Sequence, residues 1–310
     1  MAQPLRFSCG ADAAGPAHPL ATLASEQHYP AQALYVVATP IGNRADITLR
    51  ALHVLALADT VACEDTRHTA QLLRSYGLQR PLLTVHEHNE ASAAHEVVRR
   101  LLDGQRVAYV SDAGTPGISD PGARLCAAVQ AAGLRCIPVP GASSVTALLS
   151  VAGLNDGAVM VAGFLPPKGQ ARAQALQRWL ALPTAVLLLE APHRIERLAD
   201  ELRVLGARRV TVGRELTKQF EEIATLPCAE LGAWLLERPE RLRGEFALVL
   251  HGPVTVGGHA GPELDAEARR VLALLLQELP AARAARLAAA ITGAPRDALY
   301  AAAHAPAPPG

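Results

Sequence analysis

Short apolar runs alternate with amphipathic stretches of helical length from Leu34 onward. In the first half, the runs at residues 34–38, 60–63, 82–85, 107–110 and 134–139 are typical of strands. Between them, one helix has Asp46 as its expected N-cap, another ends at Gly77, and a third runs from about residue 91 to Gly104, which suits a left-handed C′ position. Alternation of this kind predicts parallel β-α-β units.

A second α/β block is expected after Gly153. Strands are predicted at residues 159–164, 185–189, 210–213 and 246–251, with helices at about 170–182 and 193–205. The domain prediction is a disordered leader (1–32), an N-terminal α/β domain (33–153), a C-terminal α/β domain (154–252), a linker (253–262), a small helical domain of three helices (263–304) and a tail (305–310). The helical domain is long enough for a helix-turn-helix-like module, although an inert appendage fits the same pattern.

Composition narrows the class of protein. Lys plus Arg and Asp plus Glu number 29 each in 310 residues, so any nucleic-acid contact must come from a local patch. The five cysteines are odd in number and contain no Cys-x-x-Cys pair, which indicates reduced thiols rather than disulfides or a zinc site. Neither a signal peptide nor an apolar stretch of membrane-spanning length is present, so we expect a soluble, cytoplasmic protein.

Three turns at strand ends carry the first chemical signal, because ligands of α/β sheets bind beyond the carboxyl ends of the strands. These are residues 38–43 (Ala-Thr-Pro-Ile-Gly-Asn), 111–122, which are dense in Gly, Pro, Ser, Thr and Asp, and 138–144, where serines can cap the next helix. Neither Gly-x-Gly-x-x-Gly nor the P-loop pattern occurs, which disfavours nicotinamide and ATP chemistry.

Polar clusters follow other strands. Residues 64–68 (Glu-Asp-Thr-Arg-His) and 86–89 (His-Glu-His-Asn) share one expected sheet edge, and residues 190–194 and 214–218 end strands of the second block. A metal site from His86, His88 and Glu64 is a second interpretation, but that spacing matches no standard ligand set. Recurrence at strand ends favours one cleft shared by the two blocks.

Taken together, residues 34–43, 63–67, 86–89, 111–122 and 214–218 strongly resemble the RsmI family. These are 16S rRNA cytidine 2′-O-methyltransferases, a branch of the tetrapyrrole-methylase superfamily, and the likeness covers about residues 33–252 and a C-terminal helical domain. The resemblance implies the class III methyltransferase fold, an α/β fold of two domains with S-adenosyl-L-methionine in the cleft between them. It also implies a homodimer that acts on 16S rRNA of the small ribosomal subunit.

The resemblance implies cofactor contacts at the three turns and, from the second domain, at Glu190. The implied residues are Pro40, Asp112, Ala113, Gly114, Thr115, Ile118, Ser143, Ser144 and Glu190. No resident metal is expected.

Transfer of a methyl group to a ribose hydroxyl benefits from a general base and from side chains that bind the flanking phosphates. The candidates for catalysis are Glu64, Asp65, Glu87, His88, Glu215 and Lys218, the last only if burial lowers its pKa. The candidates for RNA binding are Arg67, His193, Arg194 and Arg214, and loss of charge at Arg194 is expected to weaken RNA binding alone. Alternatives are a tetrapyrrole or translation-factor methylase on the same fold, or a noncatalytic ribosome-associated RNA-binding protein.

Overall fold

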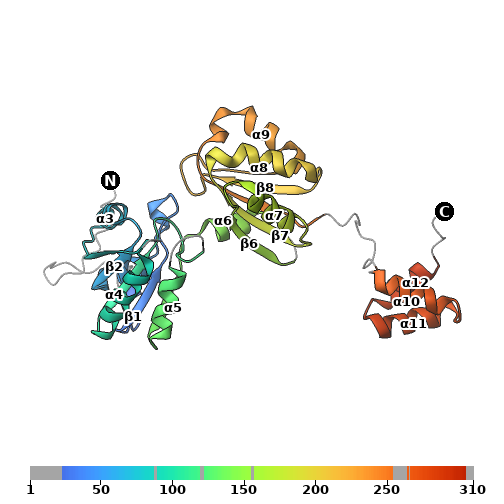
Figure 1. The fold of residues 1–310 in the computed structure, drawn as a ribbon, viewed down its shortest axis with the longest axis horizontal. Coiled ribbons are helices and arrows are strands. Elements are labelled where there is room, and N and C mark those ends of the chain that lie inside the picture. Colours follow the sequence, from blue (N-terminus) through green and yellow to red (C-terminus); the bar gives the residue numbers. More distant parts are fainter. Residues whose placement is uncertain are drawn as a thin grey trace. The chain divides into compact units, whose positions relative to one another are not determined.

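The computed structural model describes residues 23–86, 89–118, 122–154, 157–253, 264 and 266–304. The chain forms two compact units, Met1–Pro253 and Val254–Gly310, and each is described by itself. Figure 1 shows two sheets with flanking helices in the first unit and a group of helices in the second.

The first sheet is entirely parallel, in the order β3-β2-β4-β1-β5. Its strands are β1 (Ala33–Val37), β2 (Thr60–Cys63), β3 (Leu82–Thr84), β4 (Arg106–Val110) and β5 (Arg135–Val139). All five predicted strands are therefore confirmed, with ends that shift by at most one residue. Because the strands are parallel, their carboxyl ends and the turns that follow lie along one edge.

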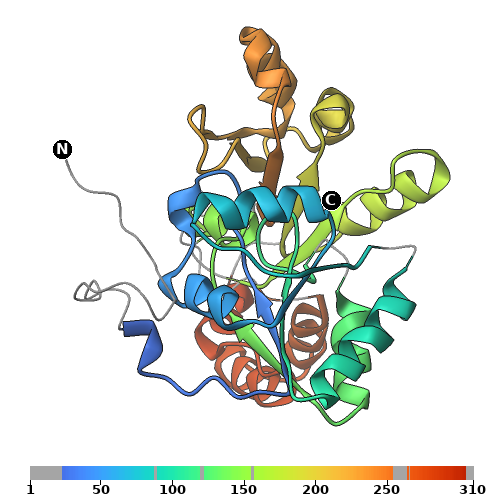
Figure 2. The same cartoon turned by 90° about the vertical axis from the view of Figure 1, so that its left-hand side faces the viewer.

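Helices cover both faces of this sheet, as the turned view in Figure 2 shows. They are α2 (Leu49–Leu57), α3 (Thr66–Ser75), α4 (Glu90–Leu102) and α5 (Ala123–Ala131). Alternation along β1 decides which helices each face receives: Tyr35 and Val37 pack with α2 and α3, whereas Leu34 packs with α4 and α5. Both faces are thus buried, which explains why these strands are almost uniformly apolar.

The second sheet is mixed, in the order β6-β7-β10-β8-β9. Its strands are β6 (Val159–Phe164), β7 (Ala185–Glu190), β8 (Arg209–Arg214), β9 (Glu222–Pro227) and β10 (Phe246–Leu250). Only β6 and β7 pair in parallel, and the other neighbours are antiparallel. The four predicted strands are confirmed, whereas the edge strand β9 was not predicted.

One face of the second sheet packs against α7 (Gly169–Leu180), α8 (Ile195–Leu202) and α9 (Leu231–Glu237). The other face packs against α6 (Ser144–Val151), which follows the first sheet, and against Ile41 from the turn after β1. The amphipathic helices expected near residues 170–182 and 193–205 correspond to α7 and α8. The two sheets consequently meet at α6 and the turn that carries Ile41.

Details of the helix ends differ from the prediction at one point. Asp46 does not cap the first helix, because residues Arg44–Asp46 form a 3-10 turn and α2 begins after Thr48, whose side chain accepts a hydrogen bond from the Ala51 amide at 3.0 Å. Gly77 and Gly104 do follow the ends of α3 and α4 with positive φ, as expected.

Packing begins before Leu34, where order was expected to start. Tyr29 is buried in the core beside α2, and its hydroxyl donates to the Ala24 carbonyl at 2.6 Å. The part of the expected leader from residue 23 onward is therefore structured, and residues 1–22 lie outside the described part of the chain, as do 254–263 of the linker region and 305–310 of the tail.

The second unit contains the three expected helices, α10 (Ala266–Leu276), α11 (Ala281–Thr292) and α12 (Arg296–Ala303). Small alanines of α11 let it pack closely against Ala268 and Leu272 of α10 and Leu299 of α12. Gly293 ends α11 in the left-handed conformation, and Pro295 precedes α12. The unit thus has its own apolar core.

Candidate active site

The three glycine- and proline-containing turns come together at the carboxyl edge of the first sheet. Thr39 and Gly114 exchange two backbone hydrogen bonds, from the Thr39 amide at 2.9 Å and from the Gly114 amide at 3.1 Å. Thr115 donates its hydroxyl to the Ala142 carbonyl at 3.1 Å. The turns after β1, β4 and β5 therefore form one connected backbone surface.

Two glycines allow this close approach. A Cβ at Gly141 would stand 2.9 Å from the Cβ of Ala38, and one at Gly114 would stand 3.2 Å from the Ile41 side chain. Gly114 also has a φ of +83°, a conformation that costs other residues strain. Larger residues at these positions would push the turns apart.

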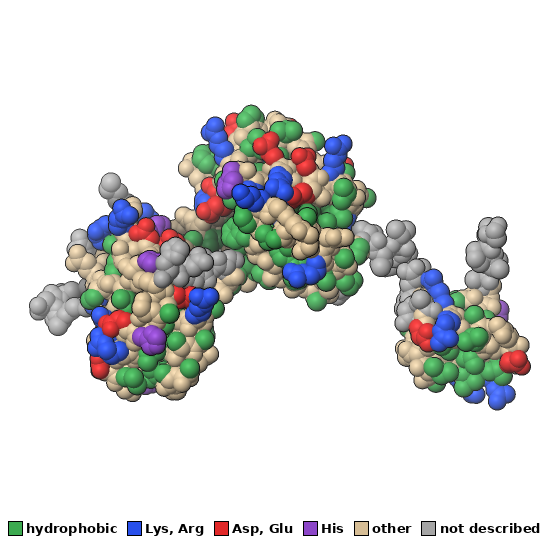
Figure 3. Space-filling view, viewed as in Figure 1, with side chains coloured by type: hydrophobic (Ala, Val, Ile, Leu, Met, Phe, Trp, Pro, Cys, Tyr) green, Lys and Arg blue, Asp and Glu red, His purple; other side chains and the backbone are tan. Residues whose placement is uncertain are grey.

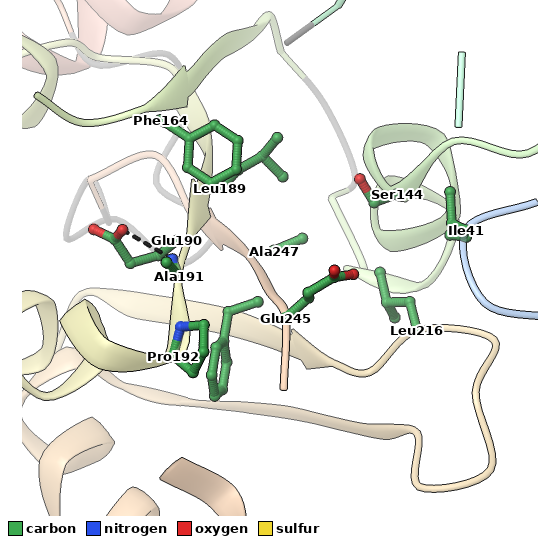
Figure 4. Close-up of a pocket in the computed structure, with 11 residues that line it drawn as sticks. Ile41, Ser144, Phe164, Leu189, Glu190, Ala191, Pro192, Leu216, Glu245 and Ala247 are labelled. Atoms are coloured by element: carbon green, nitrogen blue, oxygen red, sulfur yellow. Dashed lines mark hydrogen bonds between the residues drawn. The ribbon is translucent and has the colours of Figure 1, made fainter. Parts of the chain in front are cut away.

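An apolar cavity of about 320 Å³ lies between these turns and the second sheet (Figure 4). Its lining residues are Ile41, Ser144, Phe164, Leu189, Glu190, Ala191, Pro192, Leu216, Glu245, Phe246 and Ala247. Both domains contribute, with Ile41 and Ser144 on one side and the ends of β6, β7 and β10 on the other. Such a volume with apolar walls and a few polar groups is typical of a small-molecule site.

A polar cavity of about 380 Å³ adjoins it. Its lining residues are Pro40, Ile41, Gly42, Arg44, His68, Gln71, Leu72, Asp112, Ala113, Lys218 and Glu245. Ile41 and Glu245 line both cavities, so the two spaces meet at these side chains.

Three charged residues of the second domain, Glu215, Lys218 and Glu245, form an acid–lysine triad beside this junction. The Lys218 ammonium donates to Glu215 at 2.8 Å and to Glu245 at 3.1 Å. Glu215 and Thr217 have positive φ values of 50° and 66°, which is unusual outside glycine and frequent at functional sites. The same turn reaches the first domain, where the Asn43 amide donates to the Thr217 hydroxyl at 3.2 Å.

The triad sets the charge of Lys218. Burial by itself would lower the pKa of the lysine, but its hydrogen bonds to Glu215 and Glu245 outweigh burial and raise that pKa above its ordinary value. Lys218 therefore stays an ammonium ion at neutral pH. The condition under which it could act as the general base, a pKa lowered by burial, is not met. Burial by itself would raise the pKa of Glu215, but the hydrogen bonds from Lys218 and from the Glu245 amide outweigh burial and lower that pKa.

A buried ion network supports the wall of the apolar cavity. The side chains of Arg172 and Glu190 are completely buried and lie 3.1 Å apart, and Arg172 also pairs with Glu201 at 2.7 Å. Glu190 additionally accepts hydrogen bonds from Arg194 and from the Ala191 amide. Apart from the Arg172–Glu201 pair, these bonds end at Glu190, which directly precedes Ala191 and Pro192, so they hold this wall in place.

The predicted cofactor residues differ in where the structure places them. Ser144 and Glu190 line the apolar cavity, whereas Pro40, Asp112 and Ala113 line the polar one. Gly114 and Thr115 fasten the turns behind them, and Ile118 is 45% exposed and lines neither cavity. Ser143 occupies the N-cap position of α6 but its side chain makes no capping hydrogen bond, contrary to expectation.

The candidates for general base also divide. Asp65 caps α3, and the hydrogen bonds that its carboxylate accepts from the Arg67 and His68 amides lower its pKa. Glu64 lines neither cavity, and Glu215 and Lys218 belong to the triad. Glu87 and His88 lie outside the described residues.

Two of the four predicted RNA contacts are occupied within the protein. Arg194 pairs with Glu190 and donates to the Leu165 carbonyl at 3.0 Å, and Arg214, only 7% exposed, donates to the carbonyls of Arg243 and Phe220. Arg67 and His193 are exposed. A selective effect of Arg194 on RNA binding is therefore not expected, because its loss would disturb the cavity wall.

Several lining residues were missed by sequence reasoning, namely Phe164, Leu216, Glu245, Phe246 and Ala247. The apolar ones look like ordinary strand residues, since nothing in a one-dimensional pattern distinguishes a cavity wall from a core. Glu245 had a usable signal, because it directly precedes a buried strand.

Within the described residues, no group of three His, Cys, Asp or Glu side chains has the arrangement of a metal site, including His86 with Glu64. No helix in the described part of the chain is long and apolar enough to cross a membrane.

Comparison with known proteins agrees with this geometry. Residues 33–232 match the model of the tetrapyrrole (corrin/porphyrin) methylases, and residues 262–307 match that of the RsmI C-terminal HTH domain. Relatives called ribosomal RNA small subunit methyltransferase I include those of Neisseria meningitidis serogroup B (47% identical, covering 86% of this chain and 91% of the relative) and Pseudomonas aeruginosa (47%, 86% and 95%). That of Escherichia coli O157:H7 is 45% identical, covering 86% of this chain and 93% of the relative.

Solved structures confirm the fold class. A cobalt precorrin-4 methyltransferase of cobalamin biosynthesis aligns with a TM-score of 0.54 at 17% identity, covering 70% of this chain and 94% of that one. A diphthine synthase aligns with a TM-score of 0.53 at 16% identity, covering 71% and 90%. The two-sheet unit therefore has the fold of these structures, and the family model together with the named relatives makes the chain a methyltransferase.

This chain belongs to the tetrapyrrole methylase family and, within it, to the branch of the ribosomal RNA small subunit methyltransferase I proteins.

Proposed function

We propose that this methyltransferase uses S-adenosyl-L-methionine to methylate the ribose 2′-hydroxyl of a cytidine in 16S rRNA of the small ribosomal subunit. The observation that carries the proposal is the pair of adjoining cavities, one apolar and one polar, in a chain 45–47% identical to rRNA methyltransferases over 86% of its length. We place the cofactor in the apolar cavity and the RNA in the polar cavity, so that Pro40, Asp112 and Ala113, which the resemblance implies as cofactor contacts, lie on the RNA side.

The residues of the apolar cavity fit such a cofactor. Phe164, Leu189 and Leu216 supply flat or aliphatic surface for an adenine, and the bound cofactor supplies an electrophilic methyl group. Ser144 and the backbone of the turn that carries Ile41 supply polar groups for its ribose and amino-acid part. Closure between two domains excludes water from the reacting atoms.

Recognition of RNA is expected to depend on local contacts and on folded shape. The face of the first unit in Figure 3 shows acidic and basic side chains interspersed, in keeping with a net charge of zero. Arg67 and His193 are exposed and remain the candidates for phosphate contacts. Arg283 and Arg286 of the C-terminal unit are also exposed and can add contacts to rRNA.

The test is methyl incorporation into small subunits from cells that lack this modification. Purified full-length protein with S-adenosyl-L-[methyl-³H]methionine should label 16S rRNA, and the labelled position should resist alkaline hydrolysis because its 2′-oxygen is blocked. Fully modified subunits serve as the control and should take up little label. Label on a base, on a translation factor or on a tetrapyrrole, or no label at all, would refute the proposal.

Assembly and location complete the proposal. We expect a homodimer in the cytoplasm, where ribosomal subunits are assembled and thiols stay reduced. The described cysteines, Cys63, Cys126, Cys136 and Cys228, form no disulfides. Light scattering coupled to size exclusion measures the oligomeric state, and a monomeric mass would contradict the dimer.

A further inference from the structure

The junction between the two cavities contains one carboxylate with capacity to accept a proton. Ile41 and Glu245 are the residues shared by the two linings, and of these only Glu245 is polar. Figure 4 shows its carboxylate directed toward Ser144 and Leu216 and away from Pro192. The side chain is 76% exposed, so most of its acceptor capacity is not used by the protein.

The backbone of Glu245 is nevertheless fixed. Its carbonyl accepts a hydrogen bond from the Glu215 amide at 2.9 Å, and its own amide donates to the Glu215 carboxylate at 2.9 Å. Lys218 then holds one carboxylate oxygen at 3.1 Å. Because the Glu245 backbone and one of its carboxylate oxygens are held by the triad, the position of the second carboxylate oxygen is also set.

Other carboxylates near the cavities are already engaged. Glu190 is completely buried between two arginines, Glu215 accepts from Lys218 and from the Glu245 amide, and Asp65 caps α3. Asp112 accepts a hydrogen bond from the Asp65 amide at 3.3 Å. Among these groups Glu245 is the most exposed, and its carboxylate, like that of Asp112, has one partner within the protein.

The polar cavity has the chemistry of a nucleotide site. Arg44 is exposed at its rim and can pair with a phosphate, while Gln71 and Asp112 offer hydrogen-bonding groups to a base. The other ionisable side chains that line this space are those of His68, Lys218 and Glu245.

We propose that the polar cavity holds the acceptor nucleotide and that Glu245 is the general base that takes the proton of its 2′-hydroxyl. This deepens the proposed function and depends on it. The ribose oxygen gains the methyl group as its proton passes to the Glu245 carboxylate, and the electron pair of the broken sulfur–carbon bond stays on the cofactor sulfur. The carboxylic acid then returns the proton to water.

The experiment compares Glu245→Gln with wild type, using full-length protein and unmodified small subunits. A lost general base is expected to lower kcat by about 10²- to 10⁴-fold. The variant rate should rise more steeply with pH than the wild-type rate, because hydroxide substitutes for the missing base. The matched control is Glu240→Gln, an exposed glutamate that lines neither cavity, which should keep wild-type kcat.

Binding measurements separate this role from a structural one. Calorimetric affinity for S-adenosylhomocysteine and the thermal midpoint should stay within two-fold and a few degrees of wild type in Glu245→Gln. Glu245→Asp, which keeps the carboxylate, should recover part of kcat together with the wild-type pH dependence. Loss of S-adenosylhomocysteine binding would make Glu245 a cofactor ligand instead, and a kcat above one tenth of wild type would overturn the base assignment.

Arg44→Gln tests the nucleotide site independently. It should raise KM for the subunit about ten-fold, because one charge-assisted hydrogen bond is lost, while kcat and S-adenosylhomocysteine affinity stay unchanged. An unchanged KM would overturn the placement of the nucleotide. Inactive wild-type protein would instead refute the proposed function, so the two failures are distinguishable.

Discussion

The two sheets line the cleft with different kinds of groups, backbone at the first sheet and networks of charged side chains at the second. At the first sheet the surface is backbone: turns bonded to each other through Thr39 and Gly114, with small residues where chains approach. At the second sheet it is held by charged side chains, in the buried Arg172 network and in the acid–lysine triad. A turn can be recognised in the sequence from its glycines and prolines, whereas an ion network whose partners are far apart in the chain cannot be recognised there.

Breaking the buried network should give the largest effect. Arg172→Met leaves the buried Glu190 and the partly exposed Glu201 short of a partner. This loss is expected to cost about 3–5 kcal/mol of unfolding free energy and to weaken S-adenosylhomocysteine binding through the displaced wall. Urea denaturation and calorimetry measure the two quantities.

The control is Arg197→Met, which removes another partner of Glu201. Arg197 is 53% exposed, so its loss should cost under about 1 kcal/mol. Equal costs for the two variants would mean that burial of the network contributes nothing.

A change in the backbone surface should have a smaller effect. Gly114→Ala imposes a left-handed φ on alanine, at about 1–2 kcal/mol, and places a Cβ 3.2 Å from Ile41. Gly117→Ala is matched, since φ is +82° and nothing lies within 4 Å of its added Cβ. Urea denaturation should show similar losses of stability, whereas calorimetry should show weaker S-adenosylhomocysteine binding for Gly114→Ala alone. Similar affinities would contradict a tight contact of the turns.

The smallest effect is expected from the acid–lysine triad. The folded pKa of Glu215 lies below its unfolded value of about 4.5, so its stabilisation is complete above that pH and is lost as pH falls through the folded pKa. Lys218→Met removes the cause and should flatten this acid limb, by under about 1 kcal/mol, in urea denaturation between pH 2.5 and 6. Lys168→Met, at the other, exposed lysine, should leave the limb unchanged. An acid limb identical in Lys218→Met and wild type would exclude this linkage.

Local pattern carried much of the fold, and its failures have particular causes. The strand β9 was missed because Glu222–Pro227 is a half-exposed edge strand ending in proline, with too little apolar character to signal itself. Asp46 was mistaken for a helix cap because a 3-10 turn delays the helix by two residues, and Thr48 satisfies the amide instead. The sequence does not show that Arg194 pairs with Glu190, four residues earlier, or that Arg214 donates to the Arg243 carbonyl, because both contacts form only in the folded chain.

By itself the amino-acid sequence determined the strand and helix alternation, the three glycine- and proline-containing turns after β1, β4 and β5, and the family, because strand periodicity and the chemistry of glycine and proline act over a few residues. Only the tertiary structure decided that Lys218 is held as an ammonium ion, that Glu190 is a buried support, and that Glu245 stands where two cavities meet. The reason is that burial and ion pairing depend on groups far apart in the chain, whose distances are set by the packing of one sheet against another.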